Sequence, residues 1–405
     1  MIVLFNLNKY LGGGEVILLR FAEYLKGKNV PFTILCMKDS YIYTQASKQQ
    51  FETIAWPSKA DTYFYMSKKN QIEAINSLTE HFFDYFKYKF FTFCLRDFYN
   101  LIYIVSHACK SINGAVTAVY HPGDYQYLSS LSINKHTIIH NNISLFKHLD
   151  NNNSIIFMNQ YGAKKSILKK CEDPKRVIPI PIEVLKTKVK LPSDTSNLTI
   201  TCISRFVGFK MPAVIHFINT ASDMPKHQFN LIGHGFWKSY VQLYIFFKKV
   251  KNINLLTDVG HNEINTFICN ADIGFAQGTS ALEFASRGVP VVIAPYSSLF
   301  SFILNKKYFA TGYFGVDSND LGDVYYSSYN KKNTLCELIL KFKHIVPLNT
   351  SKIESRVKFF DKNSVFSALE LVINGSCLDV YSLRYHRHFA PRIKLMMKFF
   401  FGLKK

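Results

Sequence analysis

Short hydrophobic runs alternate with longer amphipathic stretches through most of this chain. The runs that predict strands in its first part are residues 2–5, 32–36, 115–120, 137–140 and 154–158. Between the first two runs, hydrophobic spacing from about Gly14 to Leu25 predicts a helix. Strands that alternate with helices are typical of βαβ units, whose strands pair in parallel. The pattern therefore predicts an α/β fold.

A second series of such runs follows a polar, proline-containing stretch near residues 184–197. Its predicted strands are residues 198–203, 228–232, 253–256, 273–276 and 291–294. A chain of 405 residues is long enough for two domains with sizeable cores. We predict two similar α/β halves with a ligand cleft between them. The expected segments are residues 1–184, residues 197–350 and C-terminal helices at 351–405.

Charge and cysteine usage narrow the class of protein. The net charge of +21 favours a polyanionic partner, either nucleic acid or an anionic membrane. No helix-turn-helix, zinc-finger or RNP-type signature is present, so we expect no nucleic-acid partner. The eight cysteines form no CxxC pair, which predicts reduced thiols in a cytoplasmic protein and no metal site. No apolar run reaches about 18 residues, and the N-terminus is typical of a first strand, not of a signal peptide.

The segment from Gly278 to Ile293 is the most informative one for function. Gly278, Thr279 and Ser280 predict the start of a helix, with hydroxyl caps and free backbone N–H groups. Such an end suits a phosphate or the polar edge of a sugar. Glu283, expected in the first turn, carries a carboxylate that suits two adjacent ribose hydroxyls. An ordinary helix–strand unit with a solvent-facing glutamate explains the same residues.

Two cations follow the first strand of the second series. Arg205 comes directly after the strand end, and Lys210 follows it near a predicted helix start. A guanidinium and an ammonium at the carboxyl end of a strand suit a diphosphate. The alternative is a solvated surface, because the chain has 49 lysines and arginines.

Turns after other predicted strands supply further candidates. Gly13 and Gly14 follow the first strand, where glycine lets the backbone approach a ligand closely. His121 lies in a turn after the strand at 115–120 and suits a hydrogen bond to a donor sugar or acid–base chemistry. Gly233 begins a turn of the kind found beside nucleotides. A flexible turn, a structural histidine and a tight turn are the respective alternatives.

Together these segments resemble the retaining, group 1 type glycosyltransferases of the GT-B fold, in particular the bacterial enzymes of capsule, exopolysaccharide and O-antigen assembly. The segments that carry the resemblance are Gly12-Gly13-Gly14-Glu15, Arg205 with Lys210, Gly233-x-Gly235 and Glu283-x4-Gly288-x-Pro290. It covers roughly residues 1–325 and is stronger in the second half. In many such enzymes another glutamate lies eight residues before the ribose-binding one, where this chain has Phe275.

The resemblance implies two Rossmann-like domains that face each other across a cleft. The first would bind the acceptor and the second a UDP- or GDP-sugar donor, with Glu283 on the ribose. Arg205 and Lys210 would hold the diphosphate, and His121 would lie beside the donor sugar. No cofactor or metal is expected, because protein cations would stabilise the leaving diphosphate.

The C-terminal end has the composition of a membrane-binding segment. Residues 381–405 contain seven lysines and arginines, no acid and several aromatic residues. This predicts an interfacial helix on an anionic membrane, and the alternative is a last helix that packs across the two domains. Residues 82–103 form a second aromatic, basic stretch, for which a buried helix pair is the alternative.

The sequence thus favours a cytoplasmic glycosyltransferase at the inner face of the cytoplasmic membrane, acting on a lipid-linked saccharide acceptor. One alternative is a GT-B nucleotide-sugar 2-epimerase, which should have catalytic carboxylates in the cleft and no membrane tail. The other is a non-catalytic, anion-binding scaffold whose main feature is its charge.

Overall fold

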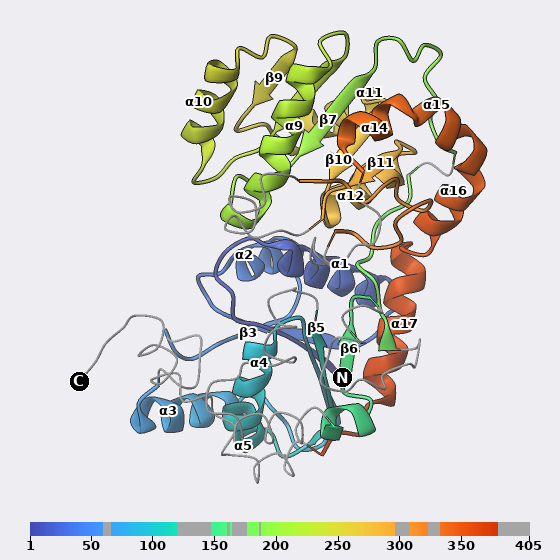
Figure 1. Cartoon of the computed structure of the whole chain (residues 1–405). Coiled ribbons are helices and arrows are strands. Elements are labelled where there is room, and N and C mark those ends of the chain that lie inside the picture. The colour runs from blue at the N-terminus through green and yellow to red at the C-terminus, as the bar shows by residue number, and fades with distance from the viewer. Residues whose placement is uncertain are drawn as a thin grey trace. The chain divides into compact units, whose positions relative to one another are not determined.

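The computed structural model describes residues 1–59, 66–119, 147–159, 163, 176–185, 188–295, 308–322 and 333–379. The chain forms two compact units. Unit 1 is Met1–Ile180 with Val365–Lys405, and unit 2 is Pro181–Ser364. Each unit has a parallel sheet with helices packed against it (Figure 1). The predicted α/β class is therefore confirmed.

The sheet of unit 1 has the strand order β3-β2-β1-β4-β5-β6. Its strands are β1 (Ile2–Asn6), β2 (Phe32–Cys36), β3 (Thr53–Ala55), β4 (Tyr88–Thr92), β5 (Ile112–Val119) and β6 (Ile155–Phe157). All neighbouring strands are parallel. The sequence analysis missed β3, which is short, and β4, which lies in the aromatic stretch at 82–103. Strand β4 is largely buried, so its residues do not show the alternation that marks a half-buried strand.

The helices of unit 1 include the predicted one, which is confirmed as α1. The helices with described bounds before residue 120 are α1 (Gly13–Gly27), α2 (Tyr41–Lys48), α3 (Lys68–Thr79), α4 (Leu95–Asn100), the π-helix η2 (Leu101–Val105) and α5 (Ser106–Ala108). Residues 82–103 thus form a strand, α4 and part of η2, not only a helix pair. Helix α17 (Lys362–Gly375) brings the chain back to unit 1, where the rings of Phe366 and Phe21 lie 5.3 Å apart. The segment expected at 351–405 is therefore shared between the two units.

The sheet of unit 2 has the strand order β11-β10-β7-β8-β9 and is also parallel throughout. Its strands are β7 (Thr199–Ile203), β8 (Gln228–Ile232), β9 (Ile253–Leu256), β10 (Ile273–Ala276) and β11 (Val291–Ile293). All five predicted strands of the second series are confirmed. The polar stretch near 184–197 lies along this unit, because Lys190 donates its N–H to the Gly288 carbonyl at 2.6 Å. The units divide a few residues earlier, after Ile180.

The helices of unit 2 lie between and after these strands. Those that the structure describes are η4 (Gly208–Lys210), α9 (Met211–Asp223), α10 (Lys238–Lys248), α11 (His261–Asn270), α12 (Thr279–Ser286), α14 (Leu335–Leu340), α15 (Phe342–Ile345), η6 (Pro347–Asn349) and α16 (Thr350–Lys358). Within the described parts of both units, no helix is long and apolar enough to cross a membrane.

In both sheets the first strand of the unit lies in the interior of the sheet, and the later strands are added on either side of it. The order in which strands are added changes direction between β1 and β4 in unit 1 and between β7 and β10 in unit 2. At such a point the connecting loops diverge to opposite faces of the sheet and leave a crevice outside the carboxyl ends of the strands. This topology makes the β1–α1, β7–α9 and β10–α12 loops the places to look for ligand-binding residues.

Candidate functional site

The loop after β7 presents the two predicted cations at the carboxyl edge of the sheet. The Arg205 side chain is exposed, whereas Lys210 is half-buried at the end of η4. Burial, followed by the nearby charge of Arg205, lowers the pKa of Lys210 to about 8. Burial raises the pKa of the adjacent Cys202 thiol to about 12, so this thiol is neutral at pH 7. Two cations that repel each other in a partly desolvated place favour a bound anion.

The loop after β10 lies on the other side of the point where the strand order changes direction. Strands β7 and β10 are neighbours, and Ile203 pairs with Ala276 at their carboxyl ends. Gly278 has the left-handed φ of +65°, and open space lies where its side chain would be. Glycine is therefore required here by conformation and leaves room for a ligand.

Helix α12 begins directly after Gly278. The predicted hydroxyl caps are wrong, because Gly278 itself is the N-cap and no side chain caps the helix. The Gly278 N–H donates to the Leu321 carbonyl at 2.7 Å. The N–H groups of Thr279 and Ser280 have no acceptor among the described residues. This helix end can therefore donate two hydrogen bonds to an anion.

Glu283 lies in the second turn of α12, not in the first turn as predicted. Its carboxylate is bound by Arg287, one helical turn later, at 2.5 Å, and its side chain is 24% exposed. Arg287 also donates to the Asn265 side chain on α11 at 2.8 Å. These contacts fix the carboxylate on one side of the helix while leaving part of it accessible.

Arg287 and Asn265 were not predicted as site residues. The four-residue spacing of Glu283 and Arg287 is typical of a helical ion pair and could have indicated the first of them. No sequence signal points to Asn265, because it comes from another helix.

The turn after β8 packs closely against the loop after β7. The β7 and β8 loops run together, and Phe206 donates its N–H to the His234 carbonyl at 2.7 Å. A side chain on Gly233 would place its Cβ 2.0 Å from the Ser204 carbonyl oxygen. Gly235 has a φ of +138°. The tight-turn interpretation therefore explains both glycines, and donor binding by Gly233 stays a prediction.

In unit 1, the glycine-rich loop is braced by a buried carboxylate. Glu15 is 6% exposed and accepts hydrogen bonds from the Asn6 and Asn8 side-chain amides at 3.0 and 3.1 Å. Gly13 is exposed, with nothing near its Cβ position, whereas that of Gly14 lies 3.7 Å from Phe93. Gly13 is thus the glycine that leaves room for a ligand in this unit.

The remaining sequence predictions concern His121, the position of a second glutamate at Phe275, and a metal site. His121 lies outside the described residues. Phe275 is fully buried in β10 and stacks on Phe217, so it does not face a ligand. His216 was not a predicted site residue. Burial lowers its pKa to about 4, and its ring accepts the Leu335 N–H, which indicates a structural role. No group of three possible metal ligands occurs in the part of the chain that the structure describes.

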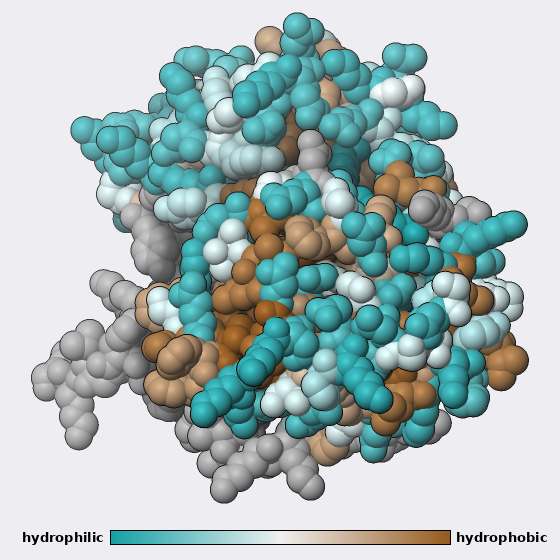
Figure 2. Space-filling view, turned by 90° about the horizontal axis from the view of Figure 1, so that it is seen from above, coloured by the Kyte–Doolittle hydropathy of each residue, from teal (hydrophilic) through white to brown (hydrophobic). Residues whose placement is uncertain are grey.

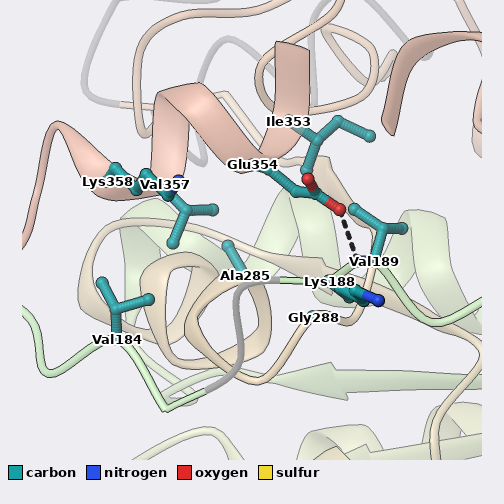
Figure 3. Close-up of a pocket in the computed structure, with 9 residues that line it drawn as sticks. All are labelled: Val184, Lys188, Val189, Ala285, Gly288, Ile353, Glu354, Val357 and Lys358. Atoms are coloured by element: carbon teal, nitrogen blue, oxygen red, sulfur yellow. Dashed lines mark hydrogen bonds between the residues drawn. The ribbon is translucent and has the colours of Figure 1, made fainter. Parts of the chain in front are cut away.

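A small hollow lies at the opposite, C-terminal end of α12 (Figure 3). Its lining residues are Val184, Lys188, Val189, Ala285, Gly288, Ile353, Glu354, Val357 and Lys358. Glu354 accepts the Val189 N–H at 3.1 Å across it. Gly288, predicted as the end of the helix, has a φ of +75°, and its Cβ position is 2.2 Å from the Lys188 carbonyl oxygen. This hollow is part of the packing of α16 on α12 within unit 2 and is separate from the loops after β7 and β10.

No family model matches this sequence, and neither does any curated protein. Several solved structures do match, each over 92% of this chain and 99% of the other. HepE of Anabaena in complex with UDP has 14% identity and a TM-score of 0.59. The lipopolysaccharide outer core galactosyltransferase WaaB has 13% identity and a TM-score of 0.57. WaaG, a glycosyltransferase involved in lipopolysaccharide biosynthesis, has 13% identity and a TM-score of 0.52.

Identities this low show the fold alone. The chain has the GT-B fold, with Rossmann-like parallel sheets of six and five strands. The predicted fold class is confirmed.

Proposed function

We propose that this protein is a glycosyltransferase that moves a sugar from a UDP- or GDP-sugar to a lipid-linked saccharide in surface polysaccharide assembly. The observation that carries the proposal is that two cations and a helix N-terminus follow the neighbouring strands β7 and β10, where the strand order of unit 2 changes direction. Arg205 and Lys210 follow β7, and the free N–H groups of α12 follow its neighbour β10. The fold shared with HepE, solved with UDP-glucose, and with WaaB supports this class of donor.

The reaction breaks the bond between the anomeric carbon of the sugar and the diphosphate. Negative charge then grows on the diphosphate oxygens, and groups already aimed at that charge lower the barrier. Arg205, Lys210 and the N–H groups of Thr279 and Ser280 have this role in the proposal. Bound diphosphate also supplies the negative charge that keeps Lys210 protonated.

Glu283 has a separate role as the acceptor of two ribose hydrogen bonds. Arg287 orients its carboxylate through the ion pair and is itself held by Asn265. In the proposal, Gly13 and Gly14 also bind the donor, and His121 lies beside the donor sugar. His121→Ala is then expected to reduce turnover with little effect on UDP affinity.

The first test is calorimetric titration of UDP and GDP into Glu283→Ala. Losing hydrogen bonds to a charged group should weaken binding by roughly 1–3 kcal/mol. Glu263→Ala is the matched control, because Glu263 is an exposed glutamate on the same unit, in α11. Unchanged nucleotide affinity in a folded Glu283→Ala protein would overturn the ribose assignment.

The second test measures the products formed from a panel of nucleotide-sugars with lipid-linked acceptors, by mass spectrometry. The proposal expects sugar transfer that needs acceptor and persists in EDTA. Release of the nucleotide without acceptor, together with an altered sugar, would indicate an epimerase instead. A protein that binds nucleotide and turns over none of the donors would be a scaffold.

The proposal also includes contact with the anionic inner face of the cytoplasmic membrane. Residues 381–405, with seven cations and no acid, lie outside the described residues and are proposed as one contact. A basic, aromatic segment gains both electrostatic attraction and shallow insertion at such a surface. Contact with the membrane would bring the enzyme to a lipid-linked acceptor.

A further inference from the structure

Helix α10 in unit 2 exposes hydrophobic side chains to solvent. The exposed residues of the helix are Tyr240 (43% exposed), Leu243 (54%), Phe246 (74%) and Phe247 (74%). Phe236 (90%) lies in the turn before it, and the five together are called the α10 surface below. Hydrophobic side chains reach the surface in a few groups among mostly hydrophilic ones (Figure 2). Apolar groups of this kind on a surface mark an interaction site.

Helix α10 has apolar residues on its solvent-facing side, where an ordinary surface helix has polar ones. With about 100° between successive residues, the members of the α10 surface within the helix occupy one arc of about 120°, opposite Val241. Tyr244 lies at the edge of this arc, where its ring stacks on that of Tyr240. Val241 is fully buried, and the Tyr244 hydroxyl donates to Asn219 of α9 at 2.9 Å. Helix α10 therefore packs on α9 with one face and presents large apolar side chains on the other.

The charged residues of the segment that carries the α10 surface are all lysines. Residues 236–251 contain four lysines and no acidic residue. Lys238 pairs with Asp258 at 2.8 Å, whereas Lys248, Lys249 and Lys251 are exposed and form no ion pair with the described residues. An exposed aromatic face bordered by unpaired lysines is complementary to an anionic lipid surface, where the rings enter the interface and the ammonium groups meet phosphates.

We infer that the α10 surface is a membrane contact of unit 2, which binds anionic phospholipid independently of the C-terminal tail. A helix of 11 residues, about 16 Å long, would lie in the plane of the interface. The inference goes beyond the proposed sugar transfer, because no catalytic step enters it. It also has a consequence for the site: Trp237, at the start of α10, donates its N–H to the Phe206 carbonyl in the Arg205 loop at 3.2 Å. The α10 surface thus begins next to the loop that carries the proposed diphosphate cations.

The test is sedimentation of the full chain with phosphatidylcholine vesicles, with and without phosphatidylglycerol. Phe246→Ser with Phe247→Ser should lower binding to the anionic vesicles by about tenfold or more, because the removed rings no longer insert. Lys248→Gln and Lys251→Gln should each lower it by about fivefold and leave binding to neutral vesicles unchanged. Leu340→Ser with Leu348→Ser is the matched control, because these leucines are 65% and 81% exposed elsewhere on unit 2.

Tryptophan fluorescence locates the contact. The chain has two tryptophans, Trp237 and Trp56, and Trp56 is 4% exposed in the core of unit 1. Brominated phospholipids in the vesicles should quench the emission of the bound protein, and Trp237→Phe should remove that quenching without loss of binding. The triple variant Arg392→Gln, Lys394→Gln and Lys398→Gln removes three cations that would attract the tail to anionic lipid. In this variant, the tryptophan emission of the membrane-bound fraction should still be quenched.

Two results would overturn the inference. One is vesicle binding that is equal in the Phe246/Phe247 variant and the wild type. The other is bound protein whose Trp237 emission is not quenched, which would assign the contact to the tail. If the phenylalanine variant instead converts a dimer to a monomer with vesicle binding unchanged, the α10 surface binds another copy of this chain. UDP affinity should be unchanged in this variant, so the outcome is independent of the proposed function.

Discussion

Among single residues, Lys210 has the most consequential protonation state. Its pKa of about 8, lowered by burial and then by Arg205, puts its charge change close to the working pH of most enzymes. The ammonium form is present below that pH and is lost above it. Because only this form attracts the diphosphate, the affinity of the free protein for UDP should fall as the pH rises through about 8.

Calorimetric titration of UDP between about pH 7 and 9 measures this effect, since an unperturbed lysine would stay charged over the whole range. The control is Lys210→Arg, in which the charge does not titrate, so its UDP affinity should vary less with pH. An affinity that is independent of pH in the wild type would place Lys210 away from the phosphates.

The same residue affects stability with the opposite dependence on pH. Its pKa in the folded protein lies below the ordinary value of 10.5, so between about pH 8 and 10 the unfolded chain binds more protons than the folded chain. This group therefore makes the free energy of unfolding rise with pH in that window. A charge that disfavours folding and favours ligand binding is typical of a functional site.

For the elements, the critical feature is the close approach of the loops after β7 and β8. A methyl group on Gly233 would overlap the Ser204 carbonyl oxygen, which lies 2.0 Å from the Cβ position and belongs to the backbone. Gly233→Ala should therefore lower the free energy of unfolding of unit 2 by about 2 kcal/mol or more. Urea unfolding followed by circular dichroism measures this change.

Gly208→Ala is the matched control for that substitution. Gly208 lies in the same β7–α9 loop and has nothing within 4 Å of its Cβ position, so alanine should change stability by less than about 1 kcal/mol. Equal stability of the two variants would mean that the β7 and β8 loops separate easily.

At the scale of the whole molecule, α17 makes the end of the chain part of unit 1. Phe366 is buried against Phe21 and Tyr24, and the Ser376 hydroxyl donates to the Ala115 carbonyl at 3.1 Å. Phe366→Ala should lower the free energy of unfolding of unit 1 by about 3–5 kcal/mol, because it leaves a cavity in the core. Leu371→Ala, at a position that is 71% exposed on the same helix, should have little effect.

Differential scanning calorimetry with and without UDP checks this division of the molecule. A ligand stabilises the part that binds it, so UDP should raise the unfolding temperature of unit 2 in both the wild type and Phe366→Ala. If Phe366→Ala lowers the unfolding temperatures of the two units equally, α17 is not specific to unit 1.

The sequence by itself determined the α/β class, all five strands of unit 2, helix α1 and the strand-end positions of Arg205, Lys210 and Gly278. These are local properties, because a hydrophobic run of four to eight residues between turn residues is short for a helix and typical of a buried parallel strand. It did not determine β4, whose buried aromatic residues fit a helix equally well.

Only the tertiary structure decided which candidate site residues lie near one another and whether each supports packing or is available to a ligand. The strand order places β7 beside β10 although about seventy residues separate them, and this pairing brings the Arg205 loop and the start of α12 to the same edge of the sheet. The packing of the β7 and β8 loops explains Gly233, and the Asn265–Arg287–Glu283 contacts link two helices. Such contacts depend on the distance between segments remote in the chain, which no local pattern encodes.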